Sequence, residues 1–133
     1  MVETIKTLTI MILDDEEDIP TLYSDYLSRK GHRVLKTYVN SETIIDDIDI
    51  EHPDAYIIDY RLPGNRNGIE VASEILKKFP SSCIMFLTAF EFLDHEISKH
   101  DIFCDKNIEI LIKPVKLRQI EDSLSNLMSH LTH

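Results

Sequence analysis

The feature that most constrains the fold of this chain is an alternation of short strand-like segments with longer amphipathic segments. Strands buried on both faces are short and apolar, whereas amphipathic helices repeat apolar residues at a spacing near 3.6. By these patterns we expect strands at residues 8–13, 33–38, 55–59, 83–87 and 108–112. We expect helices at residues 19–30, 41–48, 69–78, 92–100 and 116–131. Strands and helices that alternate in this way predict an α/β fold with a doubly wound, five-stranded parallel sheet and five helices.

Residues at the ends of these segments support the boundaries. Asp18 is expected to cap the first helix, with Pro20 in its first turn. Gly31 stands where a left-handed residue ends many helices. Phe79 and Pro80 end the third helix, because the residue before a proline avoids the α region. The local signals therefore agree with the hydrophobic periodicity.

Length and charge limit the classes of function. The chain has 133 residues, which fits a single domain over residues 1–133 with no output domain. With 24 acidic residues against 14 Lys and Arg and a net charge of −10, it lacks the positive surplus that nucleic-acid binding requires. No apolar stretch is long enough to span a membrane, and the N-terminus does not resemble a signal peptide. Together with only two cysteines, these features predict a cytoplasmic protein without nucleic-acid or membrane partners.

Polar residues stand at the ends of four of the expected strands. Asp14 and Asp15 follow the first strand, Asp59 ends the third, Thr88 follows the fourth and Lys113 follows the fifth. The carboxyl ends of parallel strands lie at one edge of the sheet, where α/β proteins bind their ligands. Three carboxylates brought together at such an edge repel one another, and a hard divalent cation such as Mg²⁺ relieves the repulsion.

This set of groups suits the transfer of a phosphoryl group to an aspartate. A carboxylate can attack phosphorus and form an aspartyl phosphate. Mg²⁺, Lys113 and Thr88 would then supply countercharge and hydrogen-bond donors for the phosphoryl oxygens. Taken one at a time, each of these residues also has an ordinary structural interpretation. Asp14 and Asp15 fit a helix start and Asp59 fits a turn. Thr88 fits a helix cap and Lys113 fits a surface lysine. The interpretation therefore rests on the whole set in this order.

Four short motifs carry these residues: LDD at 13–15, IIDYRLPG at 57–64, LTA at 87–89 and KP at 113–114. In this order and spacing they resemble the receiver domains of two-component response regulators, over about residues 9–131. The resemblance implies a flavodoxin-like sheet with strand order 2-1-3-4-5. It also implies that a sensor histidine kinase or a histidine phosphotransfer protein supplies the phosphoryl group, and that the domain signals to a downstream protein target. The only catalysis expected is of the domain's own phosphorylation and dephosphorylation.

The resemblance implies roles for individual residues as well. Asp59 is the expected phosphoacceptor, and Thr88 and Lys113 are expected to contact the phosphoryl group. Lys113 is expected to pair with Asp59 before phosphorylation, and the Lys113–Pro114 peptide bond is expected to be cis. The expected ligands of the cofactor Mg²⁺ are Asp14, Asp15, Asp59 and the backbone carbonyl of Arg61.

Several positions depart from the usual pattern of the family. The loop 63–68 and the segment 88–113 are longer than usual, and Ile110 stands where an aromatic residue is common. A branched aliphatic side chain has few χ1 rotamers and cannot move a hydroxyl between buried and exposed states. We therefore expect the response to phosphorylation to involve residues 92–107 rather than Ile110.

Two alternatives come from other functional classes. A receiver-like binding module that works without phosphorylation is disfavoured by the complete set of acidic, Thr and Lys residues. A phosphatase or mutase of the haloacid dehalogenase kind also forms an aspartyl phosphate. That family has a second aspartate two residues after the nucleophile, whereas this chain has Arg61 two residues after Asp59. Phosphorylation-dependent signalling is therefore the preferred interpretation.

Overall fold

A parallel sheet forms the centre of the molecule in this computed structural model, which describes residues 7–16, 18–63 and 66–129. Within these residues the sheet has five strands in the order β2-β1-β3-β4-β5, and every neighbouring pair is parallel. The predicted α/β class and the flavodoxin-like strand order are therefore confirmed. The strands are β1 (Thr9–Leu13), β2 (Arg33–Tyr38), β3 (Ala55–Ile58), β4 (Cys83–Thr88) and β5 (Asn107–Ile112).

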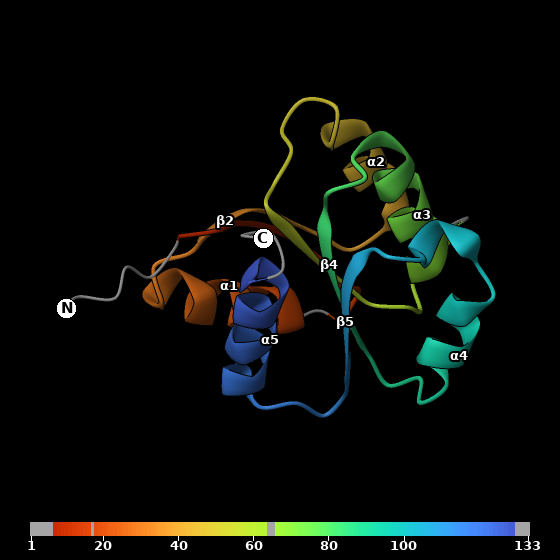
Figure 1. Cartoon of the computed structure of the whole chain (residues 1–133). Helices are drawn as coiled ribbons and strands as arrows, with labels where there is room; N and C mark the ends of the chain where they lie inside the picture. Colours follow the sequence, from red (N-terminus) through yellow and green to blue (C-terminus); the bar gives the residue numbers. More distant parts are fainter. Residues whose placement is uncertain (1–6, 17, 64–65, 130–133) are drawn as a thin grey trace.

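Helices cover both faces of the sheet (Figure 1). Two helices pack on one face and three on the other, and a short 3₁₀ helix, η1, follows α4. The first face carries α1 (Ile19–Arg29) and α5 (Leu117–Ser129); the second carries α2 (Ser41–Asp47), α3 (Gly68–Lys78), α4 (Leu93–Ser98) and η1 (Asp101–Phe103).

Alternate residues of each central strand enter different hydrophobic layers. In β1, Ile10 and Ile12 pack on the side of α1 and α5, whereas Met11 and Leu13 pack on the side of α2 and α3. All four side chains are buried. A strand covered on both faces has no solvent-facing positions, which explains why these segments are continuously apolar in the sequence.

The ends of α1 show one agreement with the sequence analysis and one difference. Gly31 adopts a φ of 92° just after the helix, as expected for a left-handed residue at a helix end. Asp18 occupies the N-cap position, but its side chain makes no capping hydrogen bond. The reason is its backbone conformation, with φ −94° and ψ −15°, because capping side chains usually belong to extended residues. The expected capping role of Asp18 is therefore wrong.

The segment after β4 is more broken than the sequence pattern indicates. We expected one helix over residues 92–100, but α4 ends at Ser98 and His100 is extended, with φ −116° and ψ 113°. The 3₁₀ helix η1 then returns Phe103 to the core, where its ring meets Phe86 edge-on at 6.2 Å. The last helix is described as far as Ser129, and its expected end at Leu131 lies outside the described residues.

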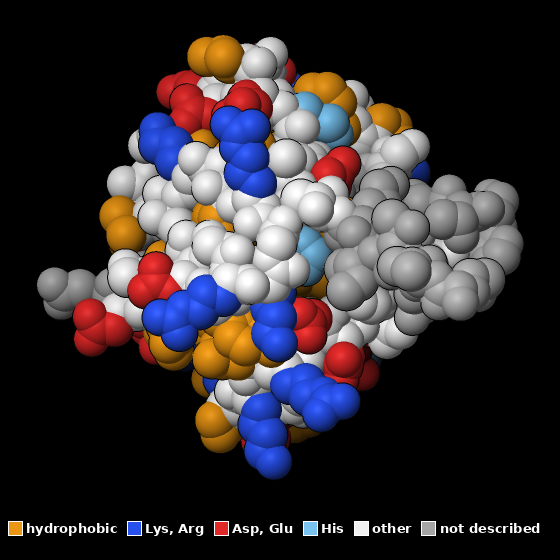
Figure 2. Space-filling view, turned by 90° about the vertical axis from the view of Figure 1, so that its left-hand side faces the viewer, with side chains coloured by type: hydrophobic (Ala, Val, Ile, Leu, Met, Phe, Trp, Pro, Cys, Tyr) orange, Lys and Arg blue, Asp and Glu red, His pale blue; other side chains and the backbone are white. Residues whose placement is uncertain are grey.

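The outer surface at the β2 edge of the sheet carries mixed charges. Figure 2 shows this face, which is the left-hand side of Figure 1, with Lys and Arg side chains interspersed with Asp and Glu side chains and with apolar ones. Two ion pairs at and just after the end of α2 join Lys36 to Asp47 at 3.0 Å and Lys78 to Asp49 at 2.9 Å. None of the helices in the described part of the chain combines the length and apolarity needed to cross a bilayer.

Candidate functional site

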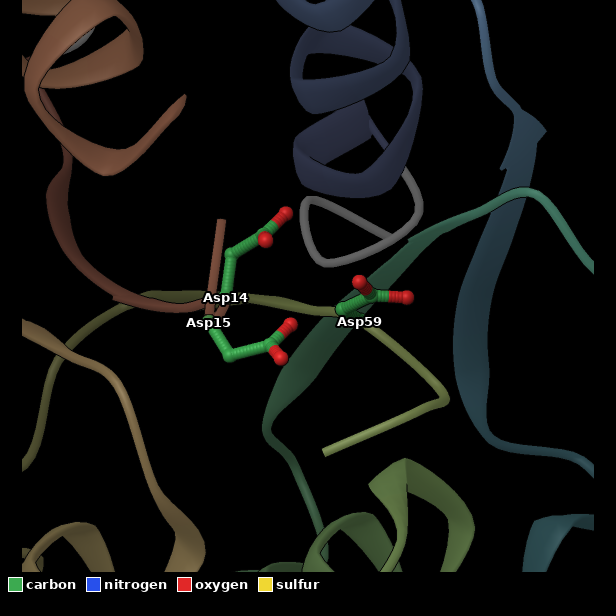
Figure 3. A group of neighbouring side chains, drawn as sticks. All are labelled: Asp14, Asp15 and Asp59. Atoms are coloured by element: carbon green, nitrogen blue, oxygen red, sulfur yellow. The ribbon is translucent and has the colours of Figure 1, made fainter. Parts of the chain in front are cut away.

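Three carboxylates meet where β1 and β3 end. These strands are parallel neighbours with Leu13 beside Ile58, so the residues that follow them emerge side by side. The backbone N–H of Asp59 donates to the carbonyl of Leu13 at 2.9 Å, which extends the pairing to the phosphoacceptor candidate. Oxygen atoms of Asp14, Asp15 and Asp59 all lie within 4.8 Å of one another (Figure 3). The structure thus brings together the three aspartates that the sequence placed at strand ends.

The environments of these carboxylates differ. Asp14 and Asp59 are buried, with 2% and 7% exposure, whereas Asp15 is exposed. Burial raises the pKa of Asp14, although hydrogen bonds from Lys113 and from the backbone of Glu16 act in the opposite direction. The nearby charge of Asp59 raises the pKa of Asp14 further. The site therefore holds more negative charge than its own groups neutralise.

Lys113 supplies the ammonium group of the site. Its Nζ donates to Oδ2 of Asp14 at 2.8 Å, to Oε1 of Glu16 at 3.1 Å and to Oδ2 of Asp59 at 3.3 Å. Burial alone would lower the pKa of Lys113, but its hydrogen bonds to the carboxylates outweigh burial and raise it. Lys113 remains an ammonium because three carboxylates accept hydrogen bonds from it. The expected pairing with Asp59 is present, but it is shared with two other partners.

The carboxylate cluster fits a hard divalent cation. Mg²⁺ prefers oxygen ligands, and its protein sites commonly use one or two carboxylates while the ion keeps several waters. Asp14, Asp15 and Asp59 offer such oxygens within 4.8 Å of one another, and a bound cation would relieve the repulsion between carboxylates at that spacing. The exposed carboxylate of Asp15 leaves the cluster open to solvent. The residues that form the site therefore suit Mg²⁺.

Thr88 lies at the end of β4 and is joined to Lys113 through the backbone. The N–H of Lys113 donates to the carbonyl of Thr88 at 2.7 Å, and the Lys113–Pro114 bond is cis, as expected. The Thr88 side chain is buried, and its Oγ1 accepts a hydrogen bond from the N–H of Phe90 at 3.2 Å. This bond uses an acceptor position of the hydroxyl and leaves its proton available as a donor.

Gly68 is a structural requirement of the site that the sequence analysis did not identify. It begins α3, and its N–H donates to the carbonyl of Tyr60 at 2.7 Å. A Cβ at this position would overlap the backbone carbonyl of Asp59 and lie 2.8 Å from the Cα of Tyr60. The available signal was the pattern Asn67-Gly68-x-Glu70, in which Asn67 and Glu70 form a capping box. Glycine at this point allows the helix to begin directly against the phosphoacceptor candidate.

An aromatic stack lies beside the site and also escaped the sequence analysis. The rings of Tyr60 and Phe90 stack with centroids 5.0 Å apart and an interplanar angle of 17°. The guanidinium of Arg61 lies 5.9 Å from the centre of the Phe90 ring, within cation–π distance. Phe92, which is largely exposed, meets Phe90 edge-on at 6.3 Å. Tyr60 and Arg61 follow Asp59 in sequence, and Phe90 lies two residues after Thr88. The stack therefore connects the loop after β3 with the loop after β4.

Comparison with known proteins gives a consistent result. The model of the response regulator receiver domain family matches residues 10–125. The response regulator TrrA from Thermotoga maritima, solved in complex with Mg²⁺-BeF, is 27% identical with a TM-score of 0.76, over 90% of this chain and 97% of that one. A CheY-like response regulator receiver domain protein from Methanospirillum hungatei is 19% identical with a TM-score of 0.79, over 94% and 96% of the two chains.

A third structure shows the same fold within a longer protein. NtrX from Brucella abortus is 24% identical with a TM-score of 0.76, and the match covers 93% of this chain but 27% of NtrX. The similarities to NtrX and to the Methanospirillum protein, at 24% and 19% identity, show a common fold. The family match spans all the strand ends that carry the carboxylates, Thr88 and Lys113.

Proposed function

The chain belongs to the response regulator receiver domain family, and on that premise we propose that Asp59 accepts a phosphoryl group in a Mg²⁺-dependent reaction. The donor is a sensor histidine kinase or a histidine phosphotransfer protein, and the phosphorylated domain signals through contacts with a downstream protein. The observation that carries this proposal is the convergence of Asp14, Asp15, Asp59 and Lys113 at the carboxyl ends of three parallel strands, β1, β3 and β5.

The reaction forms one bond to phosphorus and breaks another. An oxygen of the Asp59 carboxylate attacks phosphorus, and the bond from phosphorus to the donor breaks, with its electron pair leaving on the donor nitrogen or oxygen. Mg²⁺, held by Asp14, Asp15, Asp59 and the backbone carbonyl of Arg61, would supply positive charge to the phosphoryl oxygens. No proton has to be removed from Asp59 when its carboxylate is ionised, so the reaction needs no general base.

Lys113 and Thr88 supply the protein donors. Lys113 is already within 3.3 Å of Asp59 and is held as an ammonium, so it can donate to a phosphoryl oxygen once the group arrives. Thr88 can donate its hydroxyl proton to a second oxygen, because its present hydrogen bond to Phe90 uses the oxygen as an acceptor. A shift of Thr88 toward the phosphoryl group would pull on that hydrogen bond. This contact links the site to the segment that follows β4.

Intact-mass measurement after incubation with acetyl phosphate and Mg²⁺ tests the proposal. We expect one phosphoryl adduct on the wild-type chain, and none on Asp59→Asn or when EDTA is present. Asp46→Asn removes an exposed carboxylate from α2 and serves as the matched control, which should be phosphorylated normally. A phosphoryl adduct on Asp59→Asn would show that another residue is the acceptor. A wild-type chain that takes no phosphoryl group would support a binding module that works without phosphorylation.

A further inference from the structure

Glu16 contacts the ammonium of the site without belonging to the carboxylate cluster that suits the metal. Its Oε1 accepts from Nζ of Lys113 at 3.1 Å, although the two residues are 97 positions apart in sequence. The Glu16 side chain is 56% exposed, whereas that of Lys113 is 12% exposed. Glu16 therefore approaches the site from its solvent side.

The backbone fixes the position from which this side chain reaches inward. The N–H of Glu16 donates to Oδ1 of Asp14 at 3.0 Å, and its carbonyl accepts from the N–H of Ile19 at 3.2 Å. These bonds hold Glu16 between the end of β1 and the first turn of α1. Asp14 and Glu16 consequently contact Lys113 from the same side, namely the end of β1.

The hydrogen bonds of Lys113 are unequal. An ammonium has three donors, and the three carboxylates occupy all of them. The bond to Asp59 is the longest at 3.3 Å, compared with 2.8 Å to Asp14 and 3.1 Å to Glu16. The two partners at the end of β1 therefore hold Nζ more closely than the phosphoacceptor does.

We propose that Glu16 is a positioning residue that restrains Lys113 in the unphosphorylated site and thereby slows phosphorylation of Asp59. The inference rests on the proposed function. Asp14 and Asp59 can both turn toward a bound cation, whereas the Glu16 side chain has no second hydrogen-bond partner among the described residues and stays with Lys113. Lys113 donates to the phosphoryl oxygens more readily when this bond loosens. The restraint makes the unphosphorylated state the default of the domain.

Three variants separate this restraint from a simple effect of charge. Glu16→Gln keeps the length of the side chain but removes its charge, which weakens the contact with Lys113. Glu16→Asp keeps the charge but shortens the side chain by one methylene, so that it no longer reaches Nζ. Asp18→Asn removes an exposed negative charge two residues away that has no hydrogen bond to Lys113 among the described contacts, and it is the matched control.

Rates of phosphorylation by acetyl phosphate at saturating Mg²⁺ provide the first measurement. We expect Glu16→Gln and Glu16→Asp both to react about two- to fivefold faster than wild type, the range of an ion pair with one exposed partner. Asp18→Asn should react at the wild-type rate. Acceleration in Glu16→Gln alone, or equal acceleration in Asp18→Asn, would reduce the effect to charge and overturn the proposal. So would unchanged or slower phosphorylation of both Glu16 variants.

The ammonium signal of Lys113 in NMR spectra of the metal-free protein provides the second measurement, which does not depend on phosphorylation. The signal is assigned by its loss in Lys113→Arg. We expect both Glu16 variants to shift this signal and to speed its proton exchange with water, while Asp18→Asn leaves it unchanged. An ammonium signal unaffected by Glu16→Asp would contradict the restraint. A wild-type chain that acetyl phosphate cannot phosphorylate would refute the proposed function instead, and the ammonium measurement would still decide whether Glu16 holds Lys113.

Discussion

Magnesium should stabilise the folded protein through the carboxylate cluster. Asp14, Asp15 and Asp59 place oxygens within 4.8 Å of one another, and two unit charges at that distance repel by about 3.5 kcal/mol at an effective dielectric constant of 20. Solvent reduces this value for the pairs that include Asp15, because its side chain is exposed. Lys113 offsets part of the repulsion. The remainder disappears when a divalent cation binds, and the unfolded chain has no comparable site.

The size of the effect follows from ligand linkage. A ligand at 100 times its dissociation constant adds about 2.7 kcal/mol to the free energy of unfolding when it binds only the folded state. For a chain of 133 residues, the unfolding entropy gives a rise in Tm of about 3–4 °C per kcal/mol. Saturating Mg²⁺ should therefore raise the Tm by about 10 °C.

Thermal unfolding followed by circular dichroism at constant ionic strength measures this shift. Asp15→Asn should remove most of the response to Mg²⁺ and leave the metal-free protein at least as stable as wild type, because it removes a repelling charge from an exposed position. Asp46→Asn, which removes an exposed carboxylate of α2 outside the cluster, should keep the full response. A wild-type Tm that does not change with millimolar Mg²⁺, or an Asp15→Asn variant with the full shift, would refute the assignment of the cluster as a metal site.

Three further predictions concern the residues around the cluster. Phe90→Ala should shorten the lifetime of the phosphorylated protein several-fold, because it removes the ring that stacks on Tyr60 at 5.0 Å and opens a path for water; an unchanged decay rate, read by intact mass, would contradict this. Beryllofluoride should perturb the NMR amide signals of residues 89–107 more than those around Ile110, and Thr88→Ala should remove this remote response, because the Thr88 hydroxyl accepts a hydrogen bond from the N–H of Phe90. If the largest remote shifts are at Ile110, a different segment carries the response. Burial raises the pKa of Asp14 above its ordinary value, so the folded protein binds this proton more tightly than the unfolded chain does. Without Mg²⁺, the free energy of unfolding should therefore fall as pH rises from the ordinary aspartate range through the raised pKa, and urea titrations from about pH 4 to 7 should show a smaller fall in Asp14→Asn.

The sequence by itself determined the order of the elements and the positions of the site residues along the chain. Strands buried on both faces are apolar over their whole length, so β1, β3 and β4 were visible as short apolar runs. Once the sheet is parallel, the residues after these strands must emerge at one edge. Asp14, Asp59 and Thr88 were therefore predictable as neighbours from patterns that span only a few residues.

Local conformation was less predictable, because several backbone states suit the same residue type. Asp18 has a typical capping side chain, but its backbone enters the α region and the side chain makes no cap. The segment 92–100 has helical composition, yet the chain leaves the helix after Ser98 so that Phe103 can pack against Phe86. In the second place the packing of a distant residue accompanies the local change, because Phe103 meets Phe86 of β4.

Only the tertiary structure decided how the site's side chains are paired. Lys113 contacts Glu16 and Asp14 more closely than Asp59, and the chain separates Glu16 and Lys113 by 97 positions. Gly68 is required because α3 begins against the backbone of Asp59, a contact that exists only after the loop has closed. Periodicity and strand-end rules state where a residue lies along an element. The partners of a charged side chain depend instead on distances of a few ångströms between separate elements, and these distances are set by the packing of the whole domain.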